Sequence, residues 1–417
     1  MNNNQFKNIM LFCIGLFSSF FLRIIGAITI GEILVLFLFL FLMTKKGIYY
    51  YYNINKDLKI YTNLLLLAAF SCIISSLLTG SIENTLKGLF SILLLIPGLY
   101  VFFWLLYEEP KKIIYYLIGA VISGILVNNY FHGFSDLLVN QRSISFEEQQ
   151  EVQFAALYIP YFVLFIALLY NRFPKLTAIL MIFMGIFLLY GFSRSSFLIY
   201  IISSAILLFA SSEDRIFKMK KHISTFLIVI CITAWGAKQL YSYWASNGTL
   251  GKRAYDKYEM QSGNKGGILS SRNYFIRGLI TLTYHPILGI GIYNKVDIDE
   301  SIEIRKKFAK ITGTPYRYWD DNVASHSAML DWWIFFGILA LPFWLYVIKQ
   351  CYIFLTKYLF TYRPLTAYLL LTVVGLLWSI FFSPFGYRLS YAISLTLMAI
   401  IKSQDCNLNK DSNNNEI

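Results

Sequence analysis

His326 is the residue of this chain whose type and position most favour chemistry. It lies in Ser325-His326-Ser327, where a polar stretch from residue 242 to 325 gives way to a strongly apolar one. An imidazole titrates near neutral pH and can accept a proton from a hydroxyl group as a general base. Asp321 precedes it and could orient the ring, while Asp331 follows it inside the apolar stretch, where a carboxylate suggests a function. The competing interpretation is an interfacial histidine without a chemical role.

Two arginines have positions suited to an anion. Arg194 falls in a turn so short that two apolar segments almost meet, and its paired guanidinium donors suit phosphate or carboxylate. A simple interfacial arginine that reaches toward water is the alternative there. Arg272 follows Ser271, which can cap a helix whose N-terminus itself attracts anions. Arg277 would project about 140° away from Arg272 on that helix, so we expect it to make a structural or secondary contact.

The composition indicates that these residues belong to a membrane protein. The chain of 417 residues is 57% hydrophobic and 14% charged, whereas soluble domains carry about 25% charged residues. Apolar runs of about 20 residues cross a bilayer as helices. The sequence therefore predicts an all-α polytopic membrane protein with about twelve transmembrane helices. The predicted spans are Ile9–Ala27, Ile30–Met43, Ile60–Leu78, Leu89–Tyr107, Ile113–Val127, Val152–Tyr170, Leu176–Tyr190, Ser196–Ala210, Ile223–Leu240, Ser327–Ile348, Leu365–Phe382 and Leu389–Ile401.

The predicted organisation has four parts. Residues 1–241 form a membrane domain with nine spans, residues 242–325 form one large outer loop with short helices, residues 326–401 form three more spans, and residues 402–417 form a disordered tail. Lysines and arginines gather in alternate short loops, which face the cytoplasm by the positive-inside rule. Both termini are therefore expected in the cytoplasm, and the large loop on the outer face.

Several other function classes fit the sequence less well. The net charge of +13 is spread over the cytoplasmic turns and not gathered on one face, which argues against nucleic-acid binding. The five cysteines lie in or beside apolar segments or in the tail, so no external disulfide framework or cysteine metal site is predicted. The acidic residues from Asp297 to Glu303 match no cation-binding loop, and a solvated helix face is expected there. We therefore expect no metal and no cofactor.

Three blocks of sequence follow one another in a distinctive order. They are Phe192-Ser193-Arg194, then Ser271-Arg272 with His285-Pro286-Ile287-Leu288-Gly289-Ile290-Gly291, and then Ser325-His326-Ser327 with Asp331 and Phe336-Gly337. In order and spacing they resemble the O-antigen ligase and O-antigen polymerase family of bacterial membrane glycosyltransferases. Gln141-Arg142-Ser143 is similar to an outer-loop arginine of the family. The resemblance covers about residues 142–337 and the twelve-span layout.

The resemblance implies a metal-independent, inverting glycan transfer at the periplasmic face of the inner membrane of a Gram-negative bacterium. The donor would be an oligosaccharide on undecaprenyl diphosphate, and the acceptor a sugar hydroxyl. Arg194 and Arg272 would bind the diphosphate, and His326 would take the proton of the acceptor. Secondary site candidates are Arg277, Arg142, Asp321 and Asp331. A chain-length regulator is a further partner that such an enzyme would have.

Three functions remain open within this interpretation. A polymerase adds one lipid-linked repeat to another, and Ser327 after the histidine favours it, as does the spacing of Arg277 and Gly289. A ligase uses the same donor but transfers the glycan to the lipid A core. A flippase for lipid-linked glycans also has about twelve spans, but it needs ionisable residues along its path. Here Arg23 and Glu32 are the exceptions in the spans, and they flank the first outer turn.

Overall fold

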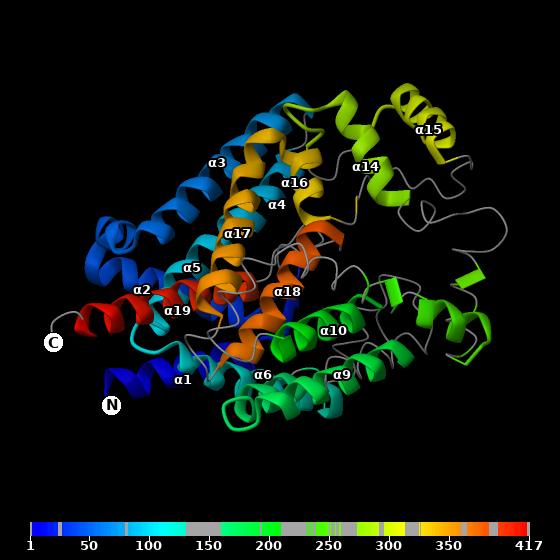
Figure 1. Ribbon diagram of the computed structural model, residues 1–417. Coiled ribbons are helices and arrows are strands. Elements are labelled where there is room, and N and C mark those ends of the chain that lie inside the picture. Colours follow the sequence, from blue (N-terminus) through cyan, green and yellow to red (C-terminus); the bar gives the residue numbers. More distant parts are fainter. Residues whose placement is uncertain are drawn as a thin grey trace.

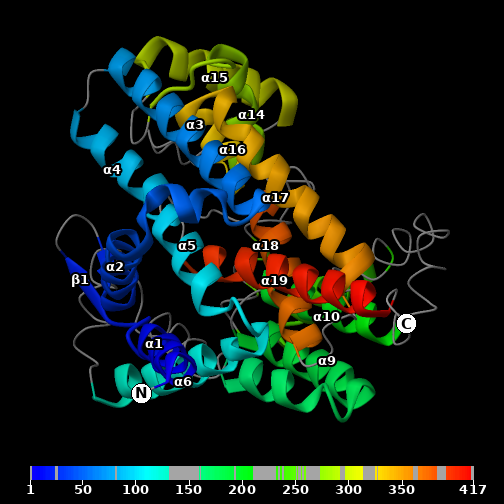
Figure 2. The same cartoon turned by 90° about the vertical axis from the view of Figure 1, so that its left-hand side faces the viewer.

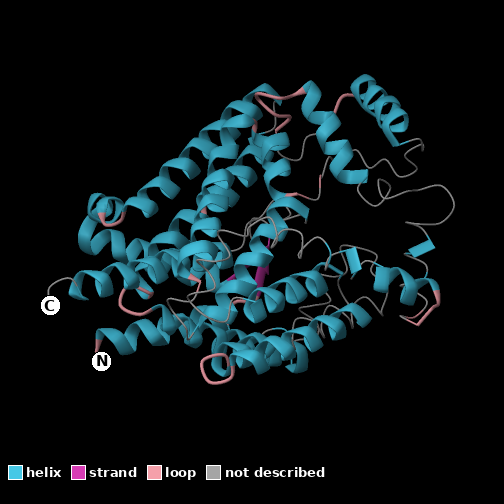
Figure 3. Cartoon of the chain, in the orientation of Figure 1, coloured by secondary structure: helices cyan, strands magenta, loops and turns pink. Residues whose placement is uncertain are grey.

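Helices make up nearly all of the described chain, which confirms the expected all-α fold (Figure 3). The structure is a computed structural model, and it describes residues 2–23, 27–79, 82–130, 159, 161–191, 194–209, 232, 235–236, 239–249, 251, 255, 258–259, 273–291, 296–312, 325, 327–359, 365–382 and 391–414. One antiparallel hairpin of β1 (Phe21–Arg23) and β2 (Ala27–Thr29) is the exception, with Phe21 opposite Thr29.

The remaining elements are α-helices and short helical turns (Figure 1). The first half holds α1 (Asn3–Leu16), α2 (Ile30–Asn53), α3 (Lys56–Thr79), α4 (Ile82–Leu93), α5 (Leu95–Leu105), η1 (Pro110–Lys112), α6 (Ile113–Tyr130), α9 (Pro174–Gly191) and α10 (Arg194–Phe209). The second half holds α14 (Asn273–Tyr284), α15 (Ile298–Thr312), α16 (Ala328–Phe336), η3 (Ile338–Ala340), α17 (Leu341–Ile353), η4 (Phe354–Tyr358), α18 (Thr366–Phe382) and α19 (Tyr391–Asn414).

Both chain ends lie on the side of the molecule away from α14 and α15 (Figures 1 and 2). These two helices belong to the segment that the sequence predicts as the large outer loop.

Three helices of the described chain are long and apolar enough to cross a membrane. They are Lys56–Leu77, Thr85–Leu105 and Ile338–Tyr358. Four further apolar helices are shorter, namely Pro174–Leu188, Ser195–Leu208, Thr366–Phe382 and Ala392–Gln404. The total of about twelve spans stays a prediction, because most of the predicted span Ile223–Leu240 and much of Val152–Tyr170 lie outside the described residues.

The first predicted span, Ile9–Ala27, is a shorter helix followed by the hairpin. α1 ends at Leu16, and the backbone N–H of Ser19 then donates to the hydroxyl of Ser123 on α6, 3.2 Å away. Phe21, after this departure, begins the paired strand β1. The N–H of Ser19 is therefore bonded to a side chain of a neighbouring helix and not to a carbonyl of α1. The apolar pattern of one segment cannot show such a contact.

The C-terminal helix also differs from expectation. α19 continues to Asn414, through most of the tail that was predicted to be disordered from residue 402. Lys402 is buried, and its ammonium lies 3.8 Å from the centre of the Phe103 ring and 4.4 Å from that of Tyr107. Gln404 is buried too and donates to Gln350 of α17 at 3.5 Å. Contacts with α5 and α17 thus order a segment whose own composition is polar.

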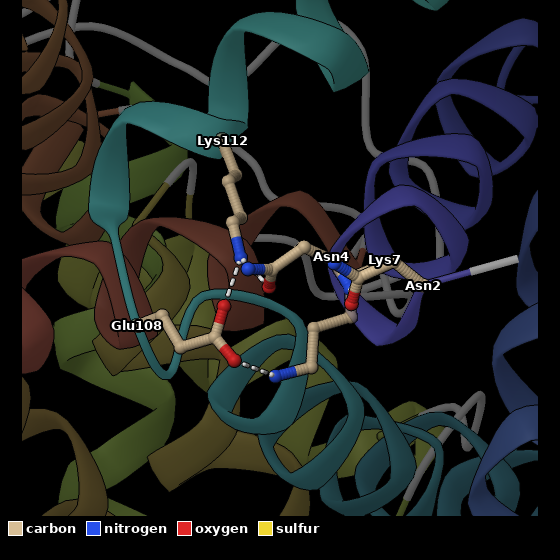
Figure 4. Close-up of polar contacts among 5 residues, drawn as sticks. All are labelled: Asn2, Asn4, Lys7, Glu108 and Lys112. Atoms are coloured by element: carbon tan, nitrogen blue, oxygen red, sulfur yellow. Dashed lines mark hydrogen bonds and ion pairs between the residues drawn. The ribbon is translucent and has the colours of Figure 1, made fainter.

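A charged network joins the start of the chain to the turn after α5 (Figure 4). Glu108 accepts from Lys112 at 2.5 Å and from Lys7 at 3.1 Å, and Lys112 also donates to Asn4 at 2.8 Å. Both lysine side chains are buried. The ammonium groups, Lys112 first and Lys7 second, hold the pKa of the Glu108 carboxyl below its usual range. The network fixes α1 against η1 at the end of the molecule that carries the termini (Figure 1).

Candidate functional site at the start of α16

Ser327 fixes the first turn of α16 in two directions. Its side chain accepts the backbone N–H of Leu330 at 3.2 Å, which is the N-cap bond that a helix start needs. The same hydroxyl donates to the carbonyl of Ile380 on α18 at 2.7 Å. The start of α16 is therefore attached to the end of α18.

Asp331 fixes the residue on the other side of His326. One oxygen of its carboxylate, Oδ1, accepts the backbone N–H of Ser325 at 2.6 Å and the hydroxyl of Ser325 at 2.7 Å. Asp331 is 6% exposed and Ser325 is fully buried. A buried carboxylate is costly unless hydrogen bonds satisfy it, so this pair is a strong local constraint.

Both chain neighbours of His326 are thus held by side-chain hydrogen bonds. His326 itself lies outside the described residues, as do Arg142, Arg272 and Asp321.

Helix α14 passes close to this segment at Gly278. A Cβ added to Gly278 would lie 2.6 Å from the Cβ of Ser325 and 3.1 Å from side-chain carbons of Leu330 and Ile334. Only a residue without a side chain permits this approach. The helix expected after Ser271 is present as α14 from Asn273, whereas the predicted cap at Ser271 and the place of Arg272 in the first turn lie outside the described residues.

The segment from Pro286 to Gly291 packs against the other end of α16. The backbone N–H of Ile290 donates to the carbonyl of Ile334 at 2.7 Å, and that of Gly291 donates to the carbonyl of Phe335 at 3.0 Å. In return, the N–H of Ile338 donates to the carbonyl of Ile287 at 2.9 Å. The indole of Trp333 donates to the carbonyl of Pro286 at 2.7 Å. The described segment Pro286–Gly291 of the second block therefore packs directly on the described helix α16 of the third block.

The last four carbonyls of α16 all have donors. The carbonyl of Trp333 accepts the N–H of Gly337 at 2.8 Å, and the carbonyls of Ile334 and Phe335 accept the N–H groups of Ile290 and Gly291. Two serines of α3 complete the set, since Ser75 donates to the carbonyl of Phe335 at 2.9 Å and Ser71 donates to that of Phe336. The last turn of a helix leaves its carbonyls without intrahelical donors, and here the neighbouring elements supply them.

This arrangement corrects the predicted span Ser327–Ile348. The helix stops at Gly337, where φ is 86° and ψ is −178°, and a new helical stretch starts at Ile338. That backbone conformation is essentially restricted to glycine. A Cβ on Gly337 would also meet the backbone of Ile287 and Leu288. A long apolar run concealed this break because nothing in its hydropathy marks it.

His285 has a structural partner. Its Nε2 lies 2.9 Å from both carboxylate oxygens of Glu300 on α15. Beside it, the Tyr284 hydroxyl donates to Glu303 at 3.0 Å. The acidic residues of α15 are thus partly used to hold α14. In the part of the chain that the structure describes, no three His, Cys, Asp or Glu side chains are grouped as metal ligands.

Of the arginines predicted for the site, Arg277 and Arg194 lie among the described residues, and their positions differ. Arg277 is 1% exposed within α14, so a side chain that was expected to make a structural or secondary contact is buried. Arg194 is the first residue of α10, and its side chain lies outside what is described. The described residues therefore bring Asp331, Ser325 and α14 together, and they do not test the contacts of the two diphosphate candidates.

The sequence did not assign roles to Ser325, Ser327, Ser71 and Ser75. Ser327 stands directly before an apolar helix, which is the signal of an N-cap. The bonds of Ser71 and Ser75 join residues far apart in the chain, and no local pattern indicates them.

Comparison with known proteins finds no relative of this chain. No family model, no curated protein and no solved structure matches this chain.

Proposed function

We propose that this chain is an O-antigen polymerase, which transfers an undecaprenyl-diphosphate-linked oligosaccharide to a sugar hydroxyl at the periplasmic face of the inner membrane. One observation supports the proposal most. The block Ser325–Asp331 includes the start of α16, and Pro286–Gly291 packs against the end of the same short helix. α14, which leads into Pro286, also contacts Ser325 at Gly278. The described parts of the two blocks that resemble the family therefore lie on one short helix and its neighbour, and this supports the proposal.

The proposed chemistry needs a base held at a membrane surface. His326 would take the proton of the acceptor hydroxyl as its oxygen attacks the anomeric carbon of the donor. The bond from that carbon to the phosphate oxygen breaks, and undecaprenyl diphosphate leaves with the electron pair. Attack from the opposite face inverts the configuration. Ser325 and Ser327, which flank the histidine, are both fixed by hydrogen bonds, and a base acts best when its position is restricted.

Arg194 and Arg272 would stabilise the charge that grows on the diphosphate. One well-placed donor at such a charge contributes on the order of 3–4 kcal/mol to the transition state. Arg142 would be a further outer-loop contact, and Asp321 would orient the histidine. Asp331 acts through Ser325 in this proposal, because its described hydrogen bonds reach that residue.

A ligase that transfers the glycan to the lipid A core is the second candidate, since it would use the same site and donor. A flippase has less support. Of its two candidate charges, Glu32 is buried and accepts the N–H of Thr29 at 2.8 Å and the Thr29 hydroxyl at 3.1 Å. This carboxylate is used locally beside the first hairpin.

The test is a strain that carries His326→Ala, with His285→Ala as its control. Lipopolysaccharide from both strains is compared with wild type on a gel. Core with a single repeat identifies a polymerase, whereas bare core with long polymer on the lipid carrier identifies a ligase. Absence of lipid-linked glycan from the periplasmic side identifies a flippase. A normal ladder at normal protein level would remove His326 from the mechanism. His285→Ala should keep the ladder, because His285 pairs with Glu300.

A further inference from the structure

α14 buries its one charged residue and exposes a leucine. Arg277 is 1% exposed, whereas Leu279 is 45% exposed. Charged side chains are rarely buried in soluble proteins, and they normally cover the solvent face of a helix. α15, the next helix of the same loop, exposes isoleucines as well, namely Ile298 and Ile302, but it also exposes charged side chains such as Lys306.

The exposed face of α14 continues into the turn that follows it. Leu279 and Thr283 are both exposed and lie four residues apart, on one side of the helix, and Ile287 follows in the turn after α14 ends at Tyr284. The Thr283 hydroxyl donates to the carbonyl of Ile280 at 2.7 Å, so it has a partner within the helix. Ile287 is 65% exposed and Leu288 is 44% exposed. The result is an uncharged stripe along Leu279, Thr283, Ile287 and Leu288.

This stripe joins the start of a candidate membrane span. Ile287 accepts the backbone N–H of Ile338, the first residue of the span Ile338–Tyr358. Ile338 and Leu339 are themselves 42% and 40% exposed, and Leu345 further along is 57% exposed. The stripe is therefore attached to the start of the span by a backbone hydrogen bond, and both expose apolar side chains.

The backbone of the turn is also suited to an apolar surrounding. The carbonyls of Pro286 and Ile287 and the N–H groups of Ile290 and Gly291 all have partners on α16 or at Ile338. In lipid an unsatisfied backbone group costs several kcal/mol, so non-helical backbone is tolerated there only when it is bonded to protein. An aqueous loop has no such requirement.

We infer that α14 and the turn at Pro286–Gly291 lie in the bilayer, in the leaflet that surrounds the start of the span at Ile338, with the stripe of Leu279, Ile287 and Leu288 against lipid acyl chains. α15 covers the opposite, aqueous side of α14, where His285 and Tyr284 bond to Glu300 and Glu303. Part of the loop predicted to be extramembrane is then an interfacial element. The inference concerns the loop alone and does not depend on glycosyl transfer.

Site-directed fluorescence in lipid vesicles tests this placement. Single cysteines replace Ile287, Leu345 and Lys306 in a chain whose five native cysteines are substituted. Each is labelled with an environment-sensitive nitrobenzoxadiazole dye and reconstituted in phosphatidylcholine vesicles with spin labels on the upper acyl chain. Leu345 is the lipid control, because it lies in the span, and Lys306 is the aqueous control on α15.

The expected result is blue-shifted emission at Ile287→Cys and loss of fluorescence with spin-labelled lipid, comparable to Leu345→Cys. Emission like that of Lys306→Cys, quenched by aqueous iodide and not by lipid, would overturn the inference. A blue shift without lipid quenching would overturn it too, since it would mean that a second copy or another part of the chain covers the stripe. Elution of each labelled protein as one peak in detergent, before reconstitution, excludes misfolding as the cause.

Discussion

The Oδ1 atom of Asp331 accepts both the backbone N–H and the hydroxyl of Ser325, at 2.6 and 2.7 Å. The sequence makes Asp331 a candidate for chemistry because it lies in an apolar stretch. The structure shows its carboxylate holding Ser325, the residue before His326, and the proposed function therefore gives Asp331 a positioning role.

Asp331→Ala should therefore reduce glycan transfer more than Asp331→Asn. An asparagine carbonyl oxygen can accept both hydrogen bonds from Ser325, whereas alanine leaves the buried N–H of Ser325 without this acceptor, at a cost of about 1–3 kcal/mol. The hydroxyl then keeps its longer hydrogen bond to the carbonyl of Ser327, at 3.2 Å. A loop displaced by about 1 Å can lower a rate on the order of 100-fold. We expect a loss of that order for Asp331→Ala in an assay with purified lipid-linked repeats.

Asp299→Ala on the exposed start of α15 is the matched control, and its rate should equal that of wild type. Equal loss in Asp331→Asn and Asp331→Ala would contradict a positioning role and would favour a negative charge that is needed in the reaction.

Gly337→Ala should destabilise the protein more than Gly47→Ala. Both glycines have backbone angles that an alanine rarely adopts, with φ of 86° and 77°, so each change carries a strain of about 1–3 kcal/mol. A Cβ at Gly47 meets nothing within 4 Å, whereas one at Gly337 would come within 2.8 Å of the backbone of Leu288. Melting temperatures in detergent separate the two effects. Equal shifts would show that the close approach of the turn to α16 contributes nothing.

The sequence predicted the class of fold and a structural role for one histidine. Long apolar runs and a low content of charged residues predicted a helical membrane protein, and three helices of the described chain are long and apolar enough to cross a membrane. His285 was expected to be structural, and its contact with Glu300 agrees. The juxtaposition of Pro286–Gly291 with α16 had no direct sequence signal, since the contacts are backbone hydrogen bonds that many residue types can form.

The errors at Ile9–Ala27 and Ser327–Ile348 have one physical origin. A hydropathy run reports that a segment is apolar, but helix ends depend on hydrogen bonds to other segments. Ser123 ends the run after α1, and the turn at Ile287 ends α16. Neither partner is near in sequence, so neither boundary could be predicted locally.

Replacing Ser71 and Ser75 with alanine should loosen the end of α16. Each hydroxyl donates to a carbonyl of the last turn, at Phe336 and Phe335 respectively. Loss of a donor to a buried acceptor costs about 1–3 kcal/mol. Phe335 keeps the N–H of Gly291 as a second donor, so we expect Ser71→Ala to cost more than Ser75→Ala.

The measurement for this pair is thermal unfolding of the two single variants and the double variant. Ser204→Ala is a suitable control, because Ser204 donates to the carbonyl of Ile201 within its own helix, at 2.9 Å. A larger loss in the control than in Ser71→Ala would contradict the idea that α3 supports the end of α16.

Glu108→Gln should lower thermal stability more than Glu83→Gln. Glu108 holds two buried lysines, Lys112 and Lys7, whereas Glu83 pairs with Lys87 on an exposed helix face. An exposed pair contributes about 0–1 kcal/mol, but a buried ammonium that loses its partner carries an uncompensated charge. Glutamine keeps the shape of Glu108 and removes the charge.

The ion pairs of Glu108 with Lys112 and Lys7 also predict that thermal stability depends on pH. The folded pKa of Glu108 is lowered, mainly by its hydrogen bond to Lys112. Its contribution is therefore fully present above the unfolded pKa of about 4.3 and is lost as the pH falls through the lower folded pKa. The melting temperature of wild type should stay above that of Glu108→Gln between pH 7 and about 4.3 and should approach it as the pH is lowered further, through the folded pKa. A gap that stays constant below about pH 4.3 as well would mean that the carboxylate charge does not stabilise this end of the fold.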